Sequence, residues 1–329
     1  MNRVTFGNSG IDISELCVGT MVFGSSCNEA EADRIVTAAI EHGADFLDTA
    51  AAYLHGDGEL LLGRILKGRR DKVTIATKCS AGTAHGDIGA ALDESLQRLQ
   101  TDHMDVYMLH WPHEGMEPHR IMSELNKAVV AGKARAVGCC NFPAWLVEHC
   151  NAIATTEGWA PLTCNQIPYN LVERGVEIEV LPQARASHVA ITVYRSLLMG
   201  ILTGKYKRGQ PAPAGSRADL DRKKRLEDWL TRYADALEQF DAYAADLNVT
   251  PAQLAIAWVR HSPAVTCTLA GFSSLKQLEP TLAAFELDLT DDQHTELSDL
   301  FGAEVKEEAG GNYANLRRNL GLVKPREKI

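Results

Sequence analysis

Four polar residues, Asp48, Tyr53, Lys78 and His110, lie at or just after the ends of short apolar runs in the first third of the chain. Asp48, Lys78 and His110 each close such a run, and Tyr53 follows Asp48 by five residues. A polar side chain at the end of a buried strand costs desolvation free energy unless it finds a partner. We therefore expect these residues to form one mutually satisfied cluster.

The residue types suit the delivery of a proton to a carbonyl oxygen. The Tyr53 hydroxyl has a usual pKa near ~10, and a neighbouring Lys78 ammonium would lower it by about 1 to 3 units. Asp48 would keep Lys78 charged, and His110 could donate a hydrogen bond to an oxygen that becomes an alkoxide. These roles predict general acid catalysis while a hydride reaches the carbonyl carbon.

Other interpretations of the same residues stay open from spacing alone. Asp48 and Lys78 could form a purely structural ion pair. His110 and His113 have the spacing of metal ligands, but extended geometry between them would splay the imidazoles, and no third ligand is evident. A barrel hydrolase with paired carboxylates would need a second acidic strand end, and none is obvious. We therefore expect no metal site.

The elements that must position these residues alternate along the chain. We predict strands at 16–21, 46–49, 73–78, 106–110, 136–140, 163–167, 190–194 and 266–270, and helices that include 29–41, 87–99, 118–131 and 143–154. Such alternation predicts parallel strands with right-handed crossovers, and eight units predict closure into an α/β (β/α)8 TIM barrel. A doubly wound open sheet is the alternative, but no G-x-G-x-x-G turn follows the first strand. In a barrel, the polar strand ends share one rim.

The barrel is expected to occupy the whole chain, residues 1–329, as a single domain. Residues 1–15 predict a β-hairpin that could plug the bottom of the barrel, because turn residues separate two short apolar runs. Residues 205–222 are polar and turn-rich, which fits either a lid over the rim or a plain surface loop. Residues 303–329 are expected to form a C-terminal loop or tail.

Composition narrows the classes of partner. The 329 residues include 33 Lys and Arg against 43 Asp and Glu, a net charge of −10, and no basic stripe points to nucleic acid. No apolar run reaches the ~20 residues that span a bilayer, and no signal peptide is evident, so we expect a cytoplasmic protein without a membrane partner. The eight cysteines form no C-x-x-C pair and are expected to be reduced and mostly buried, Cys79 included.

The chain resembles the aldo-keto reductase family over nearly its whole length. The resemblance rests on Asp48-Thr49-Ala50 with Tyr53, Glu59 and Gly63, on Ala76-Thr77-Lys78, and on residues 105–111, 138–142, 165–171 and 202–206. It implies a (β/α)8 barrel of the bacterial-type or potassium-channel-β-like branch. It further implies an NAD(P)-dependent enzyme that reduces aldehydes and ketones to alcohols without a metal. The family's catalytic tetrad matches Asp48, Tyr53, Lys78 and His110.

The resemblance also implies a nicotinamide cofactor site. Asn141 and Gln166 match residues that hold the carboxamide, Tyr194 matches the aromatic that stacks on the ring, and Cys140 stands where the family usually has Ser. The implied contacts are Gly19, Thr20, Met21, Asp48, Cys140, Asn141, Gln166, Tyr194, Arg195, Ser196, Leu197, Gly200, Lys205, Gly271, Phe272, Ser273 and Gln277. NADP(H) is the expected cofactor, and NAD(H) or dual use is the alternative, because Ser273 and Ser274 stand where many members carry Arg or Lys.

The expected partner is a small-molecule carbonyl substrate, in a pocket walled by Phe23, Tyr53, His110 and Trp111. A homo-oligomer stays open. The alternative function is a non-enzymatic or slow cofactor-sensing regulatory subunit of the same fold, which the potassium-channel β-subunits of the family exemplify.

Overall fold

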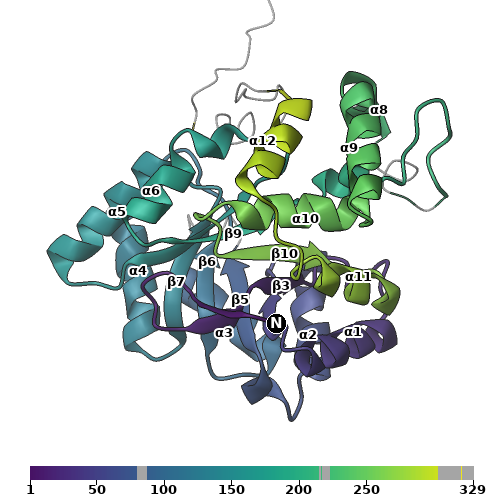
Figure 1. The fold of residues 1–329 in the computed structure, drawn as a ribbon. Coiled ribbons are helices and arrows are strands. Elements are labelled where there is room, and N and C mark those ends of the chain that lie inside the picture. The colour runs from purple at the N-terminus through teal and green to yellow at the C-terminus, as the bar shows by residue number, and fades with distance from the viewer. Residues whose placement is uncertain (80–86, 215, 217–222, 303–319, 321–329) are drawn as a thin grey trace, which may run out of the picture.

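A computed structural model describes residues 1–79, 87–214, 216, 223–302 and 320, with the backbone alone at 223–225 (Figure 1). The expected lid at 205–222 is therefore described only up to residue 214 and at residue 216. The expected tail at 303–329 lies outside the described residues, apart from residue 320.

Within the described residues, eight parallel strands close into a barrel in the order β10-β3-β4-β5-β6-β7-β8-β9. The strands are β3 (Leu16–Gly19), β4 (Phe46–Asp48), β5 (Thr74–Cys79), β6 (Met104–Leu109), β7 (Ala134–Cys140), β8 (Leu162–Pro168), β9 (Ala190–Tyr194) and β10 (Cys267–Gly271). This confirms the predicted barrel. The first strand ends at Gly19 rather than Met21, because the chain enters a turn at Met21, and the Thr20 amide and hydroxyl both donate to the Asp48 carbonyl, at 3.0 Å each.

Helices connect successive strands along the chain and surround the barrel (Figure 1). They are α1 (Glu29–Glu41), α2 (Asp57–Ile65), α3 (Ile88–Leu99), α4 (Pro118–Val130), α5 (Ala144–Glu157), α6 (Val180–Ala186), α8 (Lys223–Arg232), α9 (Ala234–Asp246), α10 (Pro251–His261), α11 (Leu278–Ala283) and α12 (Asp291–Leu300). Helix α1 matches the predicted range, since the Asn28 side chain accepts from the Glu31 amide at 3.0 Å and caps its first turn.

The N-terminal hairpin closes the bottom of the barrel as predicted. Strands β1 (Arg3–Thr5) and β2 (Asp12–Ser14) pair antiparallel. Phe6 and Ile13, both fully buried, pack with the side chains that fill the barrel interior. Gly7 lies against the lower ends of β8 and β9, where an added Cβ would approach the Thr163 carbonyl oxygen to 2.4 Å.

The barrel interior is narrow and rich in sulfur. Cys17, Cys140, Cys164 and Cys267 belong to its apolar cluster, and all eight cysteines of the chain are buried and unpaired. Gly138 makes room for this packing, because a Cβ on it would lie 2.2 Å from the Cys164 sulfur. Close packing of this kind fixes the height at which each strand ends.

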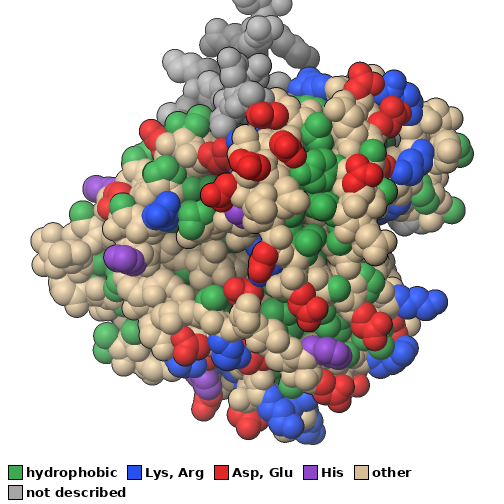
Figure 2. Space-filling model, viewed as in Figure 1, with side chains coloured by type: hydrophobic (Ala, Val, Ile, Leu, Met, Phe, Trp, Pro, Cys, Tyr) green, Lys and Arg blue, Asp and Glu red, His purple; other side chains and the backbone are tan. Residues whose placement is uncertain are grey.

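The outer surface mixes charges of both signs. Figure 2 shows acidic and basic side chains interspersed over the face in view. Among the described residues, no helix has the length and apolar character needed to cross a bilayer.

Candidate active site

The barrel brings the four predicted chemical residues to one rim. Asp48 ends β4, Lys78 lies near the end of β5, and His110 follows β6 directly. These strands are consecutive neighbours in the barrel, so their carboxyl ends lie side by side. Tyr53 begins the short 3₁₀ turn η1 (Tyr53–Gly56) in the loop after β4.

Asp48 and Lys78 form a buried ion pair at the centre of this cluster. Their side chains are 1% and 0% exposed, and the Lys78 ammonium contacts both carboxylate oxygens of Asp48. Lys78 also donates to the Thr49 carbonyl at 2.8 Å. Burial is the largest single influence and would lower the pKa of Lys78, but the Asp48 carboxylate, together with Tyr53 and Cys140, raises it by more in sum, so the Lys78 pKa is raised. Burial raises the pKa of the Asp48 carboxyl. The ammonium therefore persists at neutral pH.

Tyr53 directs its hydroxyl toward this ammonium. Its Oη lies 3.5 Å from the Lys78 Nζ, which in turn lies 5.2 Å from the centre of the Tyr53 ring. Burial raises the pKa of Tyr53 to about 12, although the Lys78 charge acts in the opposite direction. The expected lowering of this pKa below ~10 is therefore wrong for this structure, because the removal of water around the hydroxyl outweighs the neighbouring charge. Tyr53 is a protonated donor.

His110 completes the rim as an uncharged imidazole. Its ring stands edge-on to the Tyr53 ring, with centroids 6.1 Å apart. Burial, reinforced by the Lys78 charge, lowers the pKa of His110 to about 3. A neutral imidazole retains one N–H, so His110 can donate a hydrogen bond but brings no positive charge.

The turn that carries Tyr53 has an unusual backbone. Leu54, His55 and Gly56 have positive φ values of 49°, 56° and 100°. This conformation costs a residue other than glycine about 1–2 kcal/mol. The turn therefore persists because surrounding contacts hold it.

Residues at the ends of β7, β8 and β9 connect to the cluster. The Gln166 amide donates to Asp48 Oδ2 at 3.2 Å. The Asn141 amide donates to the His110 carbonyl at 3.1 Å, and the Tyr194 hydroxyl donates to Asn141 Oδ1 at 2.6 Å. The structure therefore brings Gln166 and Asn141, two of the residues expected to hold a nicotinamide ring, into direct contact with the tetrad, and joins Tyr194 to it through Asn141.

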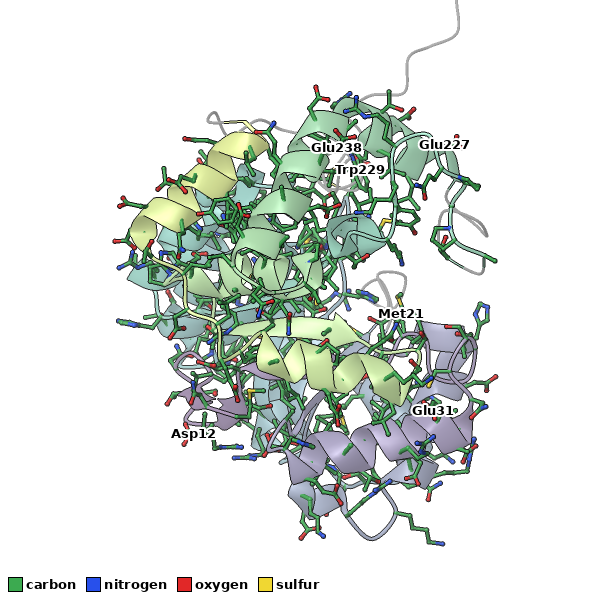
Figure 3. The ribbon with its side chains drawn as sticks, turned by 45° about the vertical axis from the view of Figure 1, so that its right-hand side comes forward. Asp12, Met21, Glu31, Glu227, Trp229 and Glu238 are labelled. Atoms are coloured by element: carbon green, nitrogen blue, oxygen red, sulfur yellow. The ribbon has the colours of Figure 1, made fainter. Side chains whose placement is uncertain are left out.

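The strands β3 and β10 both end in glycine at the rim, so no side chain projects from their last residues. Gly19 and Gly271 are opposite one another in the parallel register, and neither places a side chain there. Thr20 is buried against the Asp48 carbonyl, whereas the Met21 side chain is 49% exposed beside this rim (Figure 3). The Leu269 side chain fills the space beside Gly19, where an added Cβ would lie 2.6 Å from its Cδ2, whereas Gly271 is open and leaves room for a group to approach the end of β10.

The segment after β9 holds the next expected contacts. Arg195, one of the implied cofactor contacts, has its guanidinium 3.3 Å from the Glu173 carboxylate. Ser196 is buried and Leu197 is half-buried. Gly200 has φ 97°, and the exposed Lys205 passes so close that a Cβ on Gly200 would lie 2.7 Å from its Nζ.

The segment after β10 makes hydrogen bonds within itself. The Ser273 amide and hydroxyl donate to Gln277 Oε1 at 2.8 and 3.3 Å. Phe272 is buried in the core. Glu31 of α1 accepts from the Leu275 amide at 2.7 Å and ties this segment to the first helix (Figure 3).

Two expected contacts lie in the core instead of the rim. Cys140 is 1% exposed, and its sulfur lies 3.9 Å from the Met108 sulfur inside the barrel. Phe23 is 0% exposed in the main core, so it presents no surface to a substrate in this structure. Trp111 is half-buried next to His110 and fits a pocket wall.

Glu59 is among the residues that carry the family resemblance, but no buried partner was predicted for its carboxylate. Glu59 of α2 is 0% exposed and accepts from the Thr77 hydroxyl at 2.6 Å and from Arg98 Nε at 2.7 Å. The available signal was its place in a helical stripe with Leu62 and Gly63, where a charged residue indicates a buried partner. The identity of that partner, 39 residues away, has no local signal.

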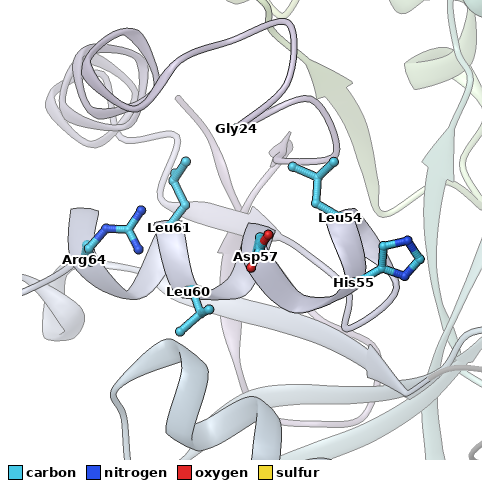
Figure 4. A pocket seen from close by; sticks show the side chains of 7 residues that line it. All are labelled: Gly24, Leu54, His55, Asp57, Leu60, Leu61 and Arg64. Carbon is cyan, nitrogen blue, oxygen red and sulfur yellow. The ribbon is translucent and has the colours of Figure 1, made fainter.

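A surface pocket is lined by residues of the turn after Tyr53, by α2 and by Gly24 (Figure 4). It has a volume of about 480 Å³ and is lined by Gly24, Leu54, His55, Asp57, Leu60, Leu61 and Arg64. None of the four tetrad residues lines it, so this pocket is separate from the chemistry.

Comparison with known proteins agrees with this geometry. The sequence model of the family described as "Aldo/keto reductase family" matches residues 15–301 of this chain. The chain is 32% identical to "Uncharacterized oxidoreductase YrpG" of Bacillus subtilis, over 93% of this chain and 99% of that protein. It is 31% identical to "Aldo-keto reductase YhdN" of the same organism, over 85% and 87%. It is 30% identical to "Protein tas" of Escherichia coli, over 88% and 94%.

Proposed function

Because the chain belongs to the aldo/keto reductase family, whose members are oxidoreductases of carbonyl compounds, we propose that it reduces an aldehyde or ketone to an alcohol with NADPH. The observation that carries the proposal is the position of the Tyr53 hydroxyl, 3.5 Å from the Lys78 ammonium and beside the neutral His110.

Proton delivery follows from the charges at the rim. Tyr53 holds its proton at neutral pH because its pKa is about 12. As the proton leaves, the Lys78 ammonium stabilises the tyrosinate that forms, and Asp48 keeps that ammonium in place. His110 donates an N–H to the same substrate oxygen without competing as an acid. When bound, a nicotinamide dinucleotide supplies the hydride for the carbonyl carbon.

The residues of the rim fit such a cofactor. Asn141 and Gln166 offer side-chain amides next to the aromatic ring of Tyr194, which suits a flat ring with a carboxamide. Beyond them, the exposed Lys205 lies over the Tyr206 ring, and the buried Tyr206 hydroxyl has no partner among the described residues. A cation and an unsatisfied hydroxyl suit the phosphates of a dinucleotide.

The choice of NADPH rests on the family resemblance, and NAD(H) is the alternative that must be tested. Ser273 and Gln277 donate and accept between themselves, and the Glu31 carboxylate lies against the same segment. A carboxylate near a 2′-phosphate would repel it. Both cofactors therefore belong in every assay.

The proposed function is tested by following the absorbance of reduced nicotinamide with a panel of aldehydes and ketones. Wild-type protein should consume NADPH, and Tyr53→Phe should lower kcat by about 10²- to 10⁴-fold while cofactor affinity stays within about twofold. Equal rates in the two proteins would contradict the role of Tyr53. Tight cofactor binding with no turnover of any carbonyl would favour the cofactor-sensing regulatory subunit.

The proposal extends to the setting of the protein. Its substrate is a small-molecule carbonyl, and its location is the cytoplasm, which eight buried and unpaired thiols support.

A further inference from the structure

The loop that carries Tyr53 is attached to both faces of β5. Inside the barrel, Lys78 donates to the Thr49 carbonyl at 2.8 Å and accepts at its own carbonyl from the Ala51 amide at 3.1 Å. Neighbouring residues of a strand point to opposite faces, so Thr77 points outward. Its hydroxyl donates to Glu59 Oε1 on α2 at 2.6 Å. Lys78 thus holds the start of the loop after β4, and its neighbour Thr77 holds α2, the helix that follows this loop.

Helix α2 is also attached to α3 through the same carboxylate. Arg98 Nε donates to Glu59 Oε2 at 2.7 Å, and the Arg98 side chain covers Gly56, where an added Cβ would lie 2.9 Å from Arg98 Cδ. At the next turn, a Cβ on Gly63 would lie 2.6 Å from the Arg98 carbonyl oxygen. The two helices are therefore in close contact along the segment that follows Tyr53.

Glu59 lies in the first turn of α2, three residues beyond Gly56, which ends the left-handed turn of Leu54, His55 and Gly56. Helix α2 meets Tyr53 directly, since a Cβ on Gly58 would lie 3.3 Å from both the Tyr53 Cβ and its carbonyl oxygen. A shift of α2 would therefore move Tyr53 and lengthen the 3.5 Å separation of its hydroxyl from Lys78.

We propose that Glu59, held by Thr77 and Arg98, is a positioning residue that keeps the Tyr53 hydroxyl within reach of Lys78. Glu59 touches neither substrate nor the reacting atoms, and it acts through the left-handed turn. The proposal rests on the proposed function, because that function assigns the transferred proton to Tyr53.

The decisive variants differ by one hydroxyl. Thr77→Val removes the group that donates to Glu59 at nearly constant volume, and Thr77→Ser keeps it. Because a small misplacement of a reacting group costs up to about 10²-fold, we expect Thr77→Val to lower kcat about tenfold. The KM for the carbonyl and the Kd for the cofactor should change less than about twofold, since the binding groups stay in place. Thr77→Ser should restore kcat.

Glu94 provides a matched control, because it also contacts Arg98. Glu94 is 70% exposed and lies 3.3 Å from Arg98 Nη1. Glu94→Gln removes the negative charge of this exposed partner and should leave kcat unchanged. An equal loss of kcat in Glu94→Gln and Thr77→Val would show a general weakening of α3 and would overturn the proposal, as would an unchanged kcat in Thr77→Val.

A second readout does not depend on turnover. Backbone hydrogen exchange of a peptide that spans Tyr53 to Gly56 should become faster in Thr77→Val and stay slow in Thr77→Ser. If the wild-type protein reduces no carbonyl, the proposed function fails. Faster exchange in Thr77→Val would still support the positioning role of Glu59, and unchanged exchange would overturn it. If Thr77→Val does not fold, Arg98→Lys replaces it, because it keeps the charge and removes the Nε donor, with the same expected changes.

Discussion

Burial and charge act in opposite directions on the Tyr53 hydroxyl, and burial is the stronger. The residue types predicted a donor next to a cation, and the structure places them 3.5 Å apart. The pKa of about 12 could not be predicted from spacing, because it depends on how much water remains around the hydroxyl. A high pKa keeps the proton available at neutral pH, so the cation matters for the tyrosinate that forms rather than for the resting acid.

The lowered pKa of His110 predicts how rate and stability respond to acid. Because its pKa is about 3 instead of the usual ~6.5, His110 stays neutral as the pH falls from 8 to 5, and kcat should show no step near pH 6.5. The unfolded chain takes up a proton at this position below ~6.5, so the contribution of His110 to the free energy of unfolding is full above that pH and is lost toward pH 3.

Steady-state kinetics and thermal unfolding across pH check this prediction, with His110→Gln as the control for stability. The melting temperature of the wild type should fall more steeply between pH 6.5 and 4 than that of His110→Gln. A step in kcat at pH 6.5, or the same pH dependence of the melting temperature in the wild type and in His110→Gln, would show that His110 becomes protonated in the folded protein.

At the scale of elements, the strands were predictable and their mutual packing was not. Short apolar runs that lead to Asp48 and Lys78 located β4 and β5, although β5 continues by one residue to Cys79. The contact between Glu59 and Arg98 had no such signal, because it joins two helices through their side chains. The close fit of Gly138 against Cys164 was likewise invisible, since it depends on the register of β7 against β8.

That fit predicts the effect of a single methyl group. Gly138→Ala should lower the free energy of unfolding by about 1–3 kcal/mol, because its Cβ would meet the Cys164 sulfur in a closed interior. Cys164→Ala in the same chain should recover part of that loss, since the sulfur would no longer occupy the space.

Denaturant unfolding of the two single variants and the double variant measures this coupling. We expect the double variant to be more stable than the sum of the single effects by about 0.5–3 kcal/mol. Simple additivity would mean that the strands move apart instead and that the sulfur does not set the limit.

At the scale of the molecule, counting eight strand and helix units was enough to predict barrel closure, since parallel strands with buried edges have few other arrangements. The hairpin was predictable from its turn, and its role as a plug follows from the burial of Phe6 and Ile13. The contact of Glu31 with the segment after β10 was not predictable, because it joins residues 244 positions apart that meet only in the folded barrel.

The most direct test of carbonyl reduction is the transfer of a label to the product. Reduced nicotinamide cofactor carrying deuterium at both hydrogen positions of the transferring carbon, in its NADPH and NADH forms, is incubated with an activated aromatic aldehyde, and the alcohol is analysed by mass spectrometry. We predict one deuterium on the carbinol carbon with wild-type protein and a much smaller yield with Tyr53→Phe. Alcohol formed without deuterium, or no alcohol across a panel of carbonyls although the cofactor is bound, would contradict the proposed function.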